Sequence, residues 1–222
     1  MLNLFFPNIC RGCHKELIEG EKEICSICRH NLPIAGFHKN GSTEMSDIFY
    51  GRIPVVHATA LFYFKKNNIT QKFVHALKYK KAKRIGLIFG EWLGEELAEC
   101  KEYQDIDAII PVPLHKKKLR QRGYNQVAGF GEKIALALQK PYIDDVLVKI
   151  TPTTSQVFKE RISRIFTNEE VFAVQNASKI ENKHILLVDD IITTGATLEA
   201  CAKKLLQIKG VKLSFATIAI TK

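Results

Sequence analysis

The sequence lacks any uninterrupted apolar stretch approaching the ~20 residues that a helix needs to cross a bilayer. Its opening residues, MLNLFFP, are apolar but short, and neither a basic segment nor a small-residue cleavage site accompanies them. Internal repeats and low-complexity tracts are also missing, which excludes repeat and fibrous architectures. These absences predict a cytoplasmic globular protein with no membrane span. A chain of 222 residues can form one good-sized domain and a small appendage.

Acidic residues are missing from two long segments. Residues 65–84 contain eight basic and no acidic residues, and residues 108–131 contain five basic and no acidic ones. The formal net charge of the whole chain is +10. Local excess positive charge suits anionic partners such as phosphates or nucleic acid, although a basic protein without such a partner would have the same total.

Four cysteines near the amino terminus are spaced as two Cys-x-x-Cys knuckles. They are Cys10, Cys13, Cys25 and Cys28. Four thiolates are the tetrahedral ligand set that zinc prefers, and they leave no open coordination position, so we expect a structural Zn²⁺ in residues 1–33. Disulfides are the alternative, which a reducing cytosol disfavours. His14 and His30 lie beside the knuckles and are alternative metal ligands.

The remaining chain divides into a linker and an alternating domain. Residues 34–54 are rich in Gly, Ser and Asn without clear periodicity, which is typical of a connecting loop. Residues 55–64 predict a strand, and residues 69–97 predict helix with a break near 80–83. Further strands are expected at 107–113, 144–150, 169–174, 183–190 and 211–220, with helices at 124–139 and 197–210. This alternation favours an α/β fold over residues 55–222, with a mostly parallel sheet flanked by helices.

The stretch ILLVDDIITTGATLEA carries the strongest functional signal. An apolar strand ends in Asp189 and Asp190, and a loop of small and hydroxyl residues leads into the next helix. The residues of that loop are Thr193, Thr194, Gly195, Ala196 and Thr197. A helix amino terminus offers unpaired N–H groups to an anion such as phosphate, whereas paired carboxylates suit vicinal ribose hydroxyls or a divalent cation. Helix capping explains one aspartate or threonine but not the whole group.

This stretch resembles the phosphoribosyl-pyrophosphate motif of type I phosphoribosyltransferases. With the four-cysteine segment it resembles the ComF family (ComFC, GntX and relatives). LKYKKAKRIG at 77–86, PVPLHKKKLRQRGYNQ at 111–126 and TPTTSQVFKERISRIFTNEEVF at 151–172 also match that family. The resemblance implies that Asp189 and Asp190 contact the ribose 2′- and 3′-hydroxyls, that residues 193–197 bind the 5-phosphate, and that Mg²⁺ accompanies phosphoribosyl pyrophosphate.

The resemblance also gives roles to the segment after the strand at 107–113. Pro113, Leu114 and His115 match the place where pyrophosphate is bound through backbone amides. A basic cluster follows, where the family has a flexible loop: Lys116, Lys117, Lys118, Arg120 and Arg122. These side chains would meet pyrophosphate, contact a nucleic-acid backbone, or form a solvated basic loop. Four more positions match the family without an assigned role: Thr154, Gln156, Arg161 and Arg164.

Family members are linked to DNA uptake in natural transformation. The resemblance therefore implies a competence protein that binds phosphoribosyl pyrophosphate or ribose 5-phosphate and handles single-stranded DNA, with other competence proteins as partners. The alternative is an active phosphoribosyltransferase of nucleotide metabolism with an unknown acceptor; we can name neither a general base nor a base-binding hood. A regulator that senses phosphoribosyl pyrophosphate is less favoured, because no helix-turn-helix segment is apparent.

Overall fold

A four-stranded parallel sheet with the order β1-β6-β5-β2 forms the centre of the computed structural model, which describes residues 8–80, 82–150 and 172–222. Its strands are β1 (Ala58–Phe64), β2 (Ala108–Pro111), β5 (His184–Ile192) and β6 (Lys212–Thr221). The predicted parallel α/β architecture is confirmed. Two of the expected strands, β3 (Leu147–Lys149) and β4 (Phe172–Val174), pair antiparallel in a separate small sheet.

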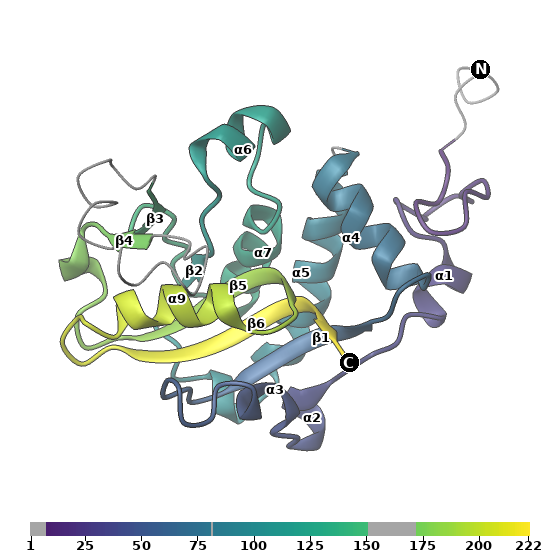
Figure 1. Cartoon of the computed structure of the whole chain (residues 1–222). Helices are drawn as coiled ribbons and strands as arrows, with labels where there is room; N and C mark the ends of the chain where they lie inside the picture. The colour runs from purple at the N-terminus through teal and green to yellow at the C-terminus, as the bar shows by residue number, and fades with distance from the viewer. Residues whose placement is uncertain (1–7, 81, 151–171) are drawn as a thin grey trace.

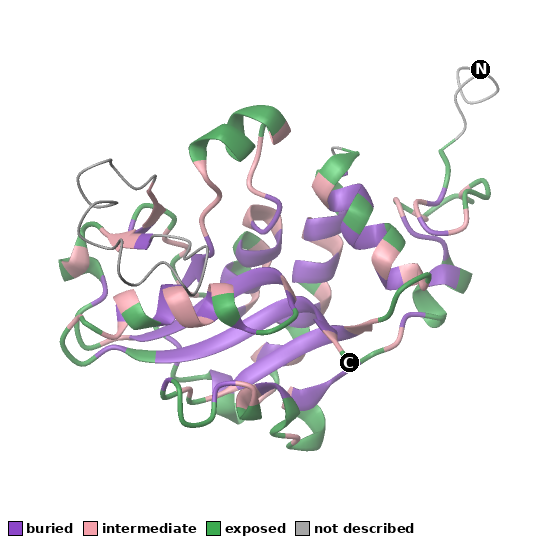
Figure 2. Ribbon diagram, in the orientation of Figure 1, coloured by how far each residue is buried: buried purple, intermediate pink, exposed green. Residues whose placement is uncertain are grey.

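Helices cover both faces of the sheet (Figure 1). One face carries α4 (Ile69–Tyr79), α5 (Lys83–Ala98) and α7 (Ala128–Leu138), and the other carries α9 (Ala196–Leu205). Along β5, Leu186 and Val188 pack into the first core, whereas Ile185 and Leu187 pack into the second. Because both faces of the sheet are covered, the sequence of β5 is a continuous apolar run. Figure 2 shows this strand coloured as buried.

Helices α5 and α7 touch at the level of their backbones. Glycines recur every four residues along one side of α5, at Gly86, Gly90 and Gly94. A Cβ at Gly90 would lie 2.7 Å from the Cα of Phe130 in α7 and closer still to the Phe130 carbonyl oxygen, separations that real Cβ atoms do not adopt. Glycine is therefore required at this position, and it brings the two helices closer than side chains would allow.

The amino-terminal segment shares the core of the main domain. It contains the short helix α1 (Ser26–His30), and its cysteines pack into the cluster formed by α4 and α5. A Cβ at Gly12 would lie 2.8 Å from the ring of Phe73 in α4, and the Lys72 ammonium donates to the Gly12 carbonyl at 3.0 Å. Figure 1 shows the segment beside α4. The two parts therefore stabilise each other.

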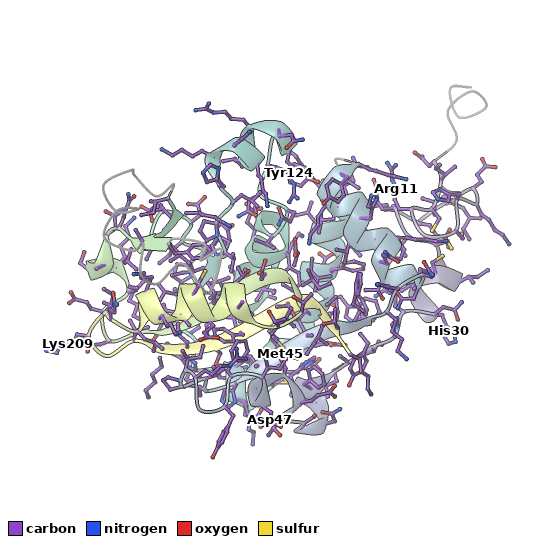
Figure 3. The ribbon with its side chains drawn as sticks, viewed as in Figure 1. Arg11, His30, Met45, Asp47, Tyr124 and Lys209 are labelled. Atoms are coloured by element: carbon purple, nitrogen blue, oxygen red, sulfur yellow. The ribbon has the colours of Figure 1, made fainter. Side chains whose placement is uncertain are left out.

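Residues 34–54, expected as a linker, contain two short helices, α2 (Phe37–Asn40) and α3 (Glu44–Asp47). Met45 and Phe49 are completely buried beneath the sheet, and the Phe49 ring contacts Phe215 edge-on with centroids 4.8 Å apart. Figure 3 labels Met45 between α3 and the sheet. The segment thus closes one face of the core, a role that its irregular spacing of apolar residues did not reveal. The boundaries 1–33, 34–54 and 55–222 stay predictions.

Three further elements complete the described chain. Two are single 3-10 turns, η2 (Lys101–Tyr103) and η3 (Ala177–Lys179). The third is helix α6 (Lys116–Arg122), which occupies the place where a flexible loop was expected. The His115 side chain accepts a hydrogen bond from the Lys117 amide at 3.2 Å, and the left-handed Gly123 ends the helix. The basic cluster is therefore ordered by caps at both ends.

Candidate functional site

The loop between β5 and α9 contains the residues predicted to bind phosphate. β5 continues two residues beyond the predicted end at Asp190, to Ile192, and α9 begins at Ala196. Thr193 and Thr194 are exposed, whereas Gly195 is buried and has a φ of 79°. After the left-handed turn at Gly195, the Ala196 amide donates to the Thr194 hydroxyl at 3.4 Å. A helix amino terminus in this setting favours an anionic ligand.

Residues of the segment 34–54 pack against the loop between β5 and α9. A Cβ at Gly195 would lie 2.9 Å from the Phe49 ring and 3.0 Å from the Ile48 side chain. Arg52 donates to the Thr194 carbonyl at 3.5 Å and pairs with Glu199 of α9 at 2.7 Å. Lys203 pairs with the other Glu199 oxygen at 2.7 Å, so two cations compensate the one acidic side chain in the first turn of α9, where negative charge would oppose anion binding.

Both aspartates of the acidic pair are buried. Asp189 is 8% exposed and Asp190 is 4% exposed, and an Asp189 carboxylate oxygen accepts the Asp190 amide at 2.8 Å. The Asp190 carboxylate meets Lys78 of α4 at 2.9 Å through one oxygen and accepts from Gln126 at 2.7 Å through the other. The pair therefore lies in a hydrogen-bonded setting, and Asp190 already faces a cation.

A chain of contacts connects Asp190 to the basic helix. Arg122 of α6 donates to the Gln126 side-chain oxygen at 2.7 Å, and the nitrogen of the same amide donates to Asp190. The Arg122 guanidinium also lies over the Tyr79 ring, 5.4 Å from its centroid. Because Gln126 is 8% exposed and engaged at both ends, its amide has one favourable orientation.

The expected pyrophosphate segment follows β2 at the same edge of the sheet. Pro113, Leu114 and His115 are half-buried. Proline has no N–H, so of these three residues only Leu114 and His115 can donate backbone hydrogen bonds to an anion. After α6 the chain comes back to the end of β2, where the Asn125 side chain donates to the Val112 carbonyl at 3.0 Å. The two predicted anion-binding stretches thus lie after neighbouring parallel strands.

Helix α6 presents its basic side chains to solvent. All residues from 116 to 121 are exposed, Arg122 is half-buried, and the helix projects from the molecule in Figure 2. Tyr124, labelled beneath this helix in Figure 3, donates to the Leu77 carbonyl of α4 and carries the Lys83 ammonium 4.9 Å from its ring centroid. Residues from the two acid-free segments of the sequence are therefore brought into contact.

The four amino-terminal cysteines form a compact cluster. Their sulfur atoms all lie within 4.8 Å of one another, and the sulfurs of Cys13 and Cys25 are 3.7 Å apart. A tetrahedral site with zinc–sulfur bonds of ~2.3 Å has sulfurs about 3.8 Å apart, whereas a disulfide requires about 2.05 Å. His14 and His30 are exposed and lie outside the cluster, and Figure 3 shows His30 at the surface of α1. The spacing fits one metal ion with four thiolate ligands.

Local hydrogen bonds prepare part of this cluster for ionisation. Burial opposes the thiolate form of Cys10, but backbone amides that include those of Gly12 and Cys25 outweigh it and lower its pKa to about 7. Burial raises the pKa of Cys28. A bound cation would offset that desolvation, because metal ligation stabilises thiolates.

Sequence reasoning missed two contributors to the site. Lys78 belongs to the basic stretch 65–84, in which the sequence alone gave no reason to choose one lysine over another. Arg52 belongs to residues 34–54, which were predicted to be a connecting loop. The lysine falls within LKYKKAKRIG, but only the packing of α4 against the sheet shows which of its cations reaches the acids. Four residues matched to the family lie outside the described ranges: Thr154, Gln156, Arg161 and Arg164.

Comparisons with known proteins agree with this geometry. Residues 128–221 match the family model described as phosphoribosyl transferase domain. Competence protein ComFC from Streptococcus pneumoniae is 34% identical over 149 residues, covering 67% of this chain and 62% of that protein, which is less than two thirds of its length. Competence protein F from Haemophilus influenzae is 29% identical over 208 residues, covering 92% and 86% of the two chains.

Among solved structures, adenine phosphoribosyltransferase from Trypanosoma brucei, in complex with AMP, pyrophosphate and ribose-5-phosphate, is 16% identical. It aligns with a TM-score of 0.40 over 72% of this chain and 83% of its own. At that TM-score the likeness adds nothing to the fold assignment, which rests on the sheet topology and the family match. In the part of the chain that the structure describes, no helix is both long and apolar enough to span a membrane.

The parallel sheet, the acidic pair and the threonine-glycine loop define a type I phosphoribosyltransferase fold, preceded by a four-cysteine cluster. Its relatives with the same domain are named competence proteins. The chain belongs to the ComF family.

Proposed function

We propose that this protein binds phosphoribosyl pyrophosphate or ribose 5-phosphate at the carboxyl edge of β5 and acts in DNA uptake by handling single-stranded DNA. The observation that carries the ligand assignment is the left-handed Gly195, which joins a buried acidic pair to the amino terminus of α9. The amino terminus of α9 suits a phosphate, and the neighbouring carboxylates suit vicinal hydroxyls. Ribose 5-phosphate carries both groups in one molecule.

In this proposal each part of the ligand has its own partners. The loop 193–197 takes the 5-phosphate through backbone amides and threonine hydroxyls, and the acidic pair accepts hydrogen bonds from the ribose hydroxyls. The amides of Leu114 and His115 and the Arg122 guanidinium face the pyrophosphate. Mg²⁺ bound to the pyrophosphate would neutralise part of its charge. Zn²⁺ held by the four cysteines would stabilise the amino-terminal segment, which is too short to have its own core.

Calorimetric titration tests the ligand site. Phosphoribosyl pyrophosphate with Mg²⁺ should bind the wild type, and Asp189→Asn/Asp190→Asn should weaken that binding by at least about tenfold, as expected when acceptors for donated hydrogen bonds are lost. The matched control is Asp144→Asn/Asp145→Asn, a second pair of adjacent aspartates, which is exposed just before β3. Absence of binding by the wild type would reject the proposal.

The exposed basic surface of α6 supports the second part of the proposal. Clustered cations contact nucleic-acid phosphates without sequence preference, and such binding weakens as salt rises. Replacing Lys116, Lys117 and Lys118 by alanine should weaken binding of a single-stranded oligonucleotide and flatten its salt dependence. The control replaces three lysines near the far end of α9: Lys204, Lys209 and Lys212. Equal effects of the two triple variants would refute α6 as the DNA-binding surface.

The proposal places the protein in the cytoplasm, where cysteines stay reduced and can hold a metal, with other competence proteins as partners. A second function, catalysis of phosphoribosyl transfer, is favoured by the family match to a phosphoribosyl transferase domain. A screen for pyrophosphate release with bases, ammonia and DNA as acceptors decides between a binding protein and an enzyme. Release that depends on the acceptor and disappears in Asp189→Asn/Asp190→Asn would establish the enzyme.

A further inference from the structure

We propose that Lys78 is the built-in counter-ion of Asp190: a positioning residue that holds this carboxylate for ribose hydroxyls and prevents it from acting as a divalent-cation ligand. This inference rests on the proposed function and adds a residue to it. It also resolves a choice that the sequence leaves open, because paired carboxylates suit either sugar hydroxyls or a metal ion.

The Asp190 carboxylate is fixed by donors from two separate elements. Lys78 approaches one oxygen from α4, and Gln126 approaches the other from the turn before α7. Each carboxylate oxygen keeps further lone-pair capacity, so two such contacts orient the group without saturating it. A hydroxyl donor can therefore still be accepted, whereas rotation of the carboxylate would break one of two charge-assisted hydrogen bonds.

Charge balance gives the second argument. A carboxylate as buried as that of Asp190, which is 4% exposed, is poorly hydrated, so it needs a nearby cation. The Lys78 ammonium lies 2.9 Å from an Asp190 oxygen. Mg²⁺ would have to approach such oxygens to about 2.0–2.1 Å in octahedral geometry. An ammonium already in contact with the carboxylate opposes that approach by charge repulsion.

Packing keeps Lys78 at this place. The preceding residue, Leu77, is 1% exposed, and its carbonyl accepts the Tyr124 hydroxyl from the connection between α6 and α7. Phe73 anchors the previous turn of α4 in the same core. The last turn of the helix is thus held on both sides. Lys80 lies two residues further on, exposed and beyond the end of the helix, and serves as a control for charge alone.

The first arm of the test measures metal binding without ligand. Mn²⁺, followed by electron paramagnetic resonance, should bind Lys78→Met at least about tenfold more tightly than the wild type, because the Asp190 carboxylate loses the ammonium that opposes the metal ion. Lys78→Gln, which keeps a hydrogen-bond donor but removes the charge, should also gain Mn²⁺ affinity. Lys80→Met loses the same charge and should behave as the wild type. Unchanged Mn²⁺ affinity in both Lys78 variants would overturn the inference.

The second arm compares two ligands by calorimetry. Lys78→Met should weaken ribose 5-phosphate on the order of tenfold while inorganic phosphate, which needs only the loop, binds as in the wild type. Lys78→Arg should restore part of the difference, because it returns a cation to the carboxylate. An equal loss for both ligands would indicate a merely structural role and reject the positioning role. If the wild type binds no ribose 5-phosphate, the proposed function fails, and the Mn²⁺ arm still decides whether Lys78 is the counter-ion.

Discussion

Gly195→Ala tests the packing of the loop between β5 and α9 through protein stability. The backbone at this residue has a φ of 79°, a conformation that costs an L-residue about 1–2 kcal/mol. The new Cβ would also lie 2.9 Å from the Phe49 ring and 3.0 Å from Ile48, and such overpacking of a buried site costs about 1–3 kcal/mol. We therefore expect the free energy of unfolding to fall by about 2–5 kcal/mol, the sum of the two effects.

Urea denaturation measures this loss as a shift of the midpoint at constant slope. The matched control is Gly123→Ala, because Gly123 has a φ of 77° and a Cβ added there would have no neighbouring atom within 4 Å. Only the backbone penalty of about 1–2 kcal/mol applies at that position. Adding Phe49→Leu to Gly195→Ala should recover part of the clash, so that the double variant is more stable than additivity predicts. Equal losses for the two glycine variants would refute close packing of Phe49 under the loop.

Three further predictions concern other parts of the chain. Cys28→Ser should reduce bound zinc below one per chain by metal analysis and lower the melting temperature, whereas full zinc retention would exclude the four-thiolate site. Burial lowers the pKa of His38 although Glu96 beside it acts in the opposite sense, so the free energy of unfolding should decrease as the pH falls below ~6.5, and His38→Gln should reduce that slope. Gly90→Ala should lower the denaturation midpoint strongly, because its Cβ meets the Phe130 carbonyl; a neutral effect would contradict backbone contact between α5 and α7.

The parallel sheet could be predicted because its signal is local. β5 and β6 are long apolar runs. A strand that is covered on both faces is apolar along its whole length, so its own sequence is enough to identify it. The break in the long helical stretch was also predicted, since α4 ends at Tyr79 and α5 begins at Lys83. The continuation of β5 past the acidic pair, to Ile192, was not expected; pairing of Ile191 and Ile192 with β6 extends the strand there.

The parts that sequence reasoning missed depend on distant contacts. Met45 and Phe49 are buried by the shape of the sheet above them, although their own segment has no helical or strand periodicity. Lys78 is one of eight basic residues in a stretch whose other cations include exposed ones, and only tertiary packing selects it as the partner of Asp190. Helix α6 forms where a flexible loop was expected, because the caps at His115 and Gly123 together fix its two ends.

The backbone contact between α5 and α7 has an evolutionary consequence. The distance between α5 and α7 is set by backbone contact at Gly90, so side-chain substitutions elsewhere do not change it. The start of α7 therefore keeps its position relative to the sheet. The turn before α7 carries Gln126, and α6 is attached to that turn. The exposed residues of α6, from 116 to 121, can therefore vary without moving Gln126 or the Asp190 carboxylate that it contacts. Close packing of α5 and α7 at Gly90 thus fixes the position of the turn before α7, whereas the exposed surface of α6 can change in sequence.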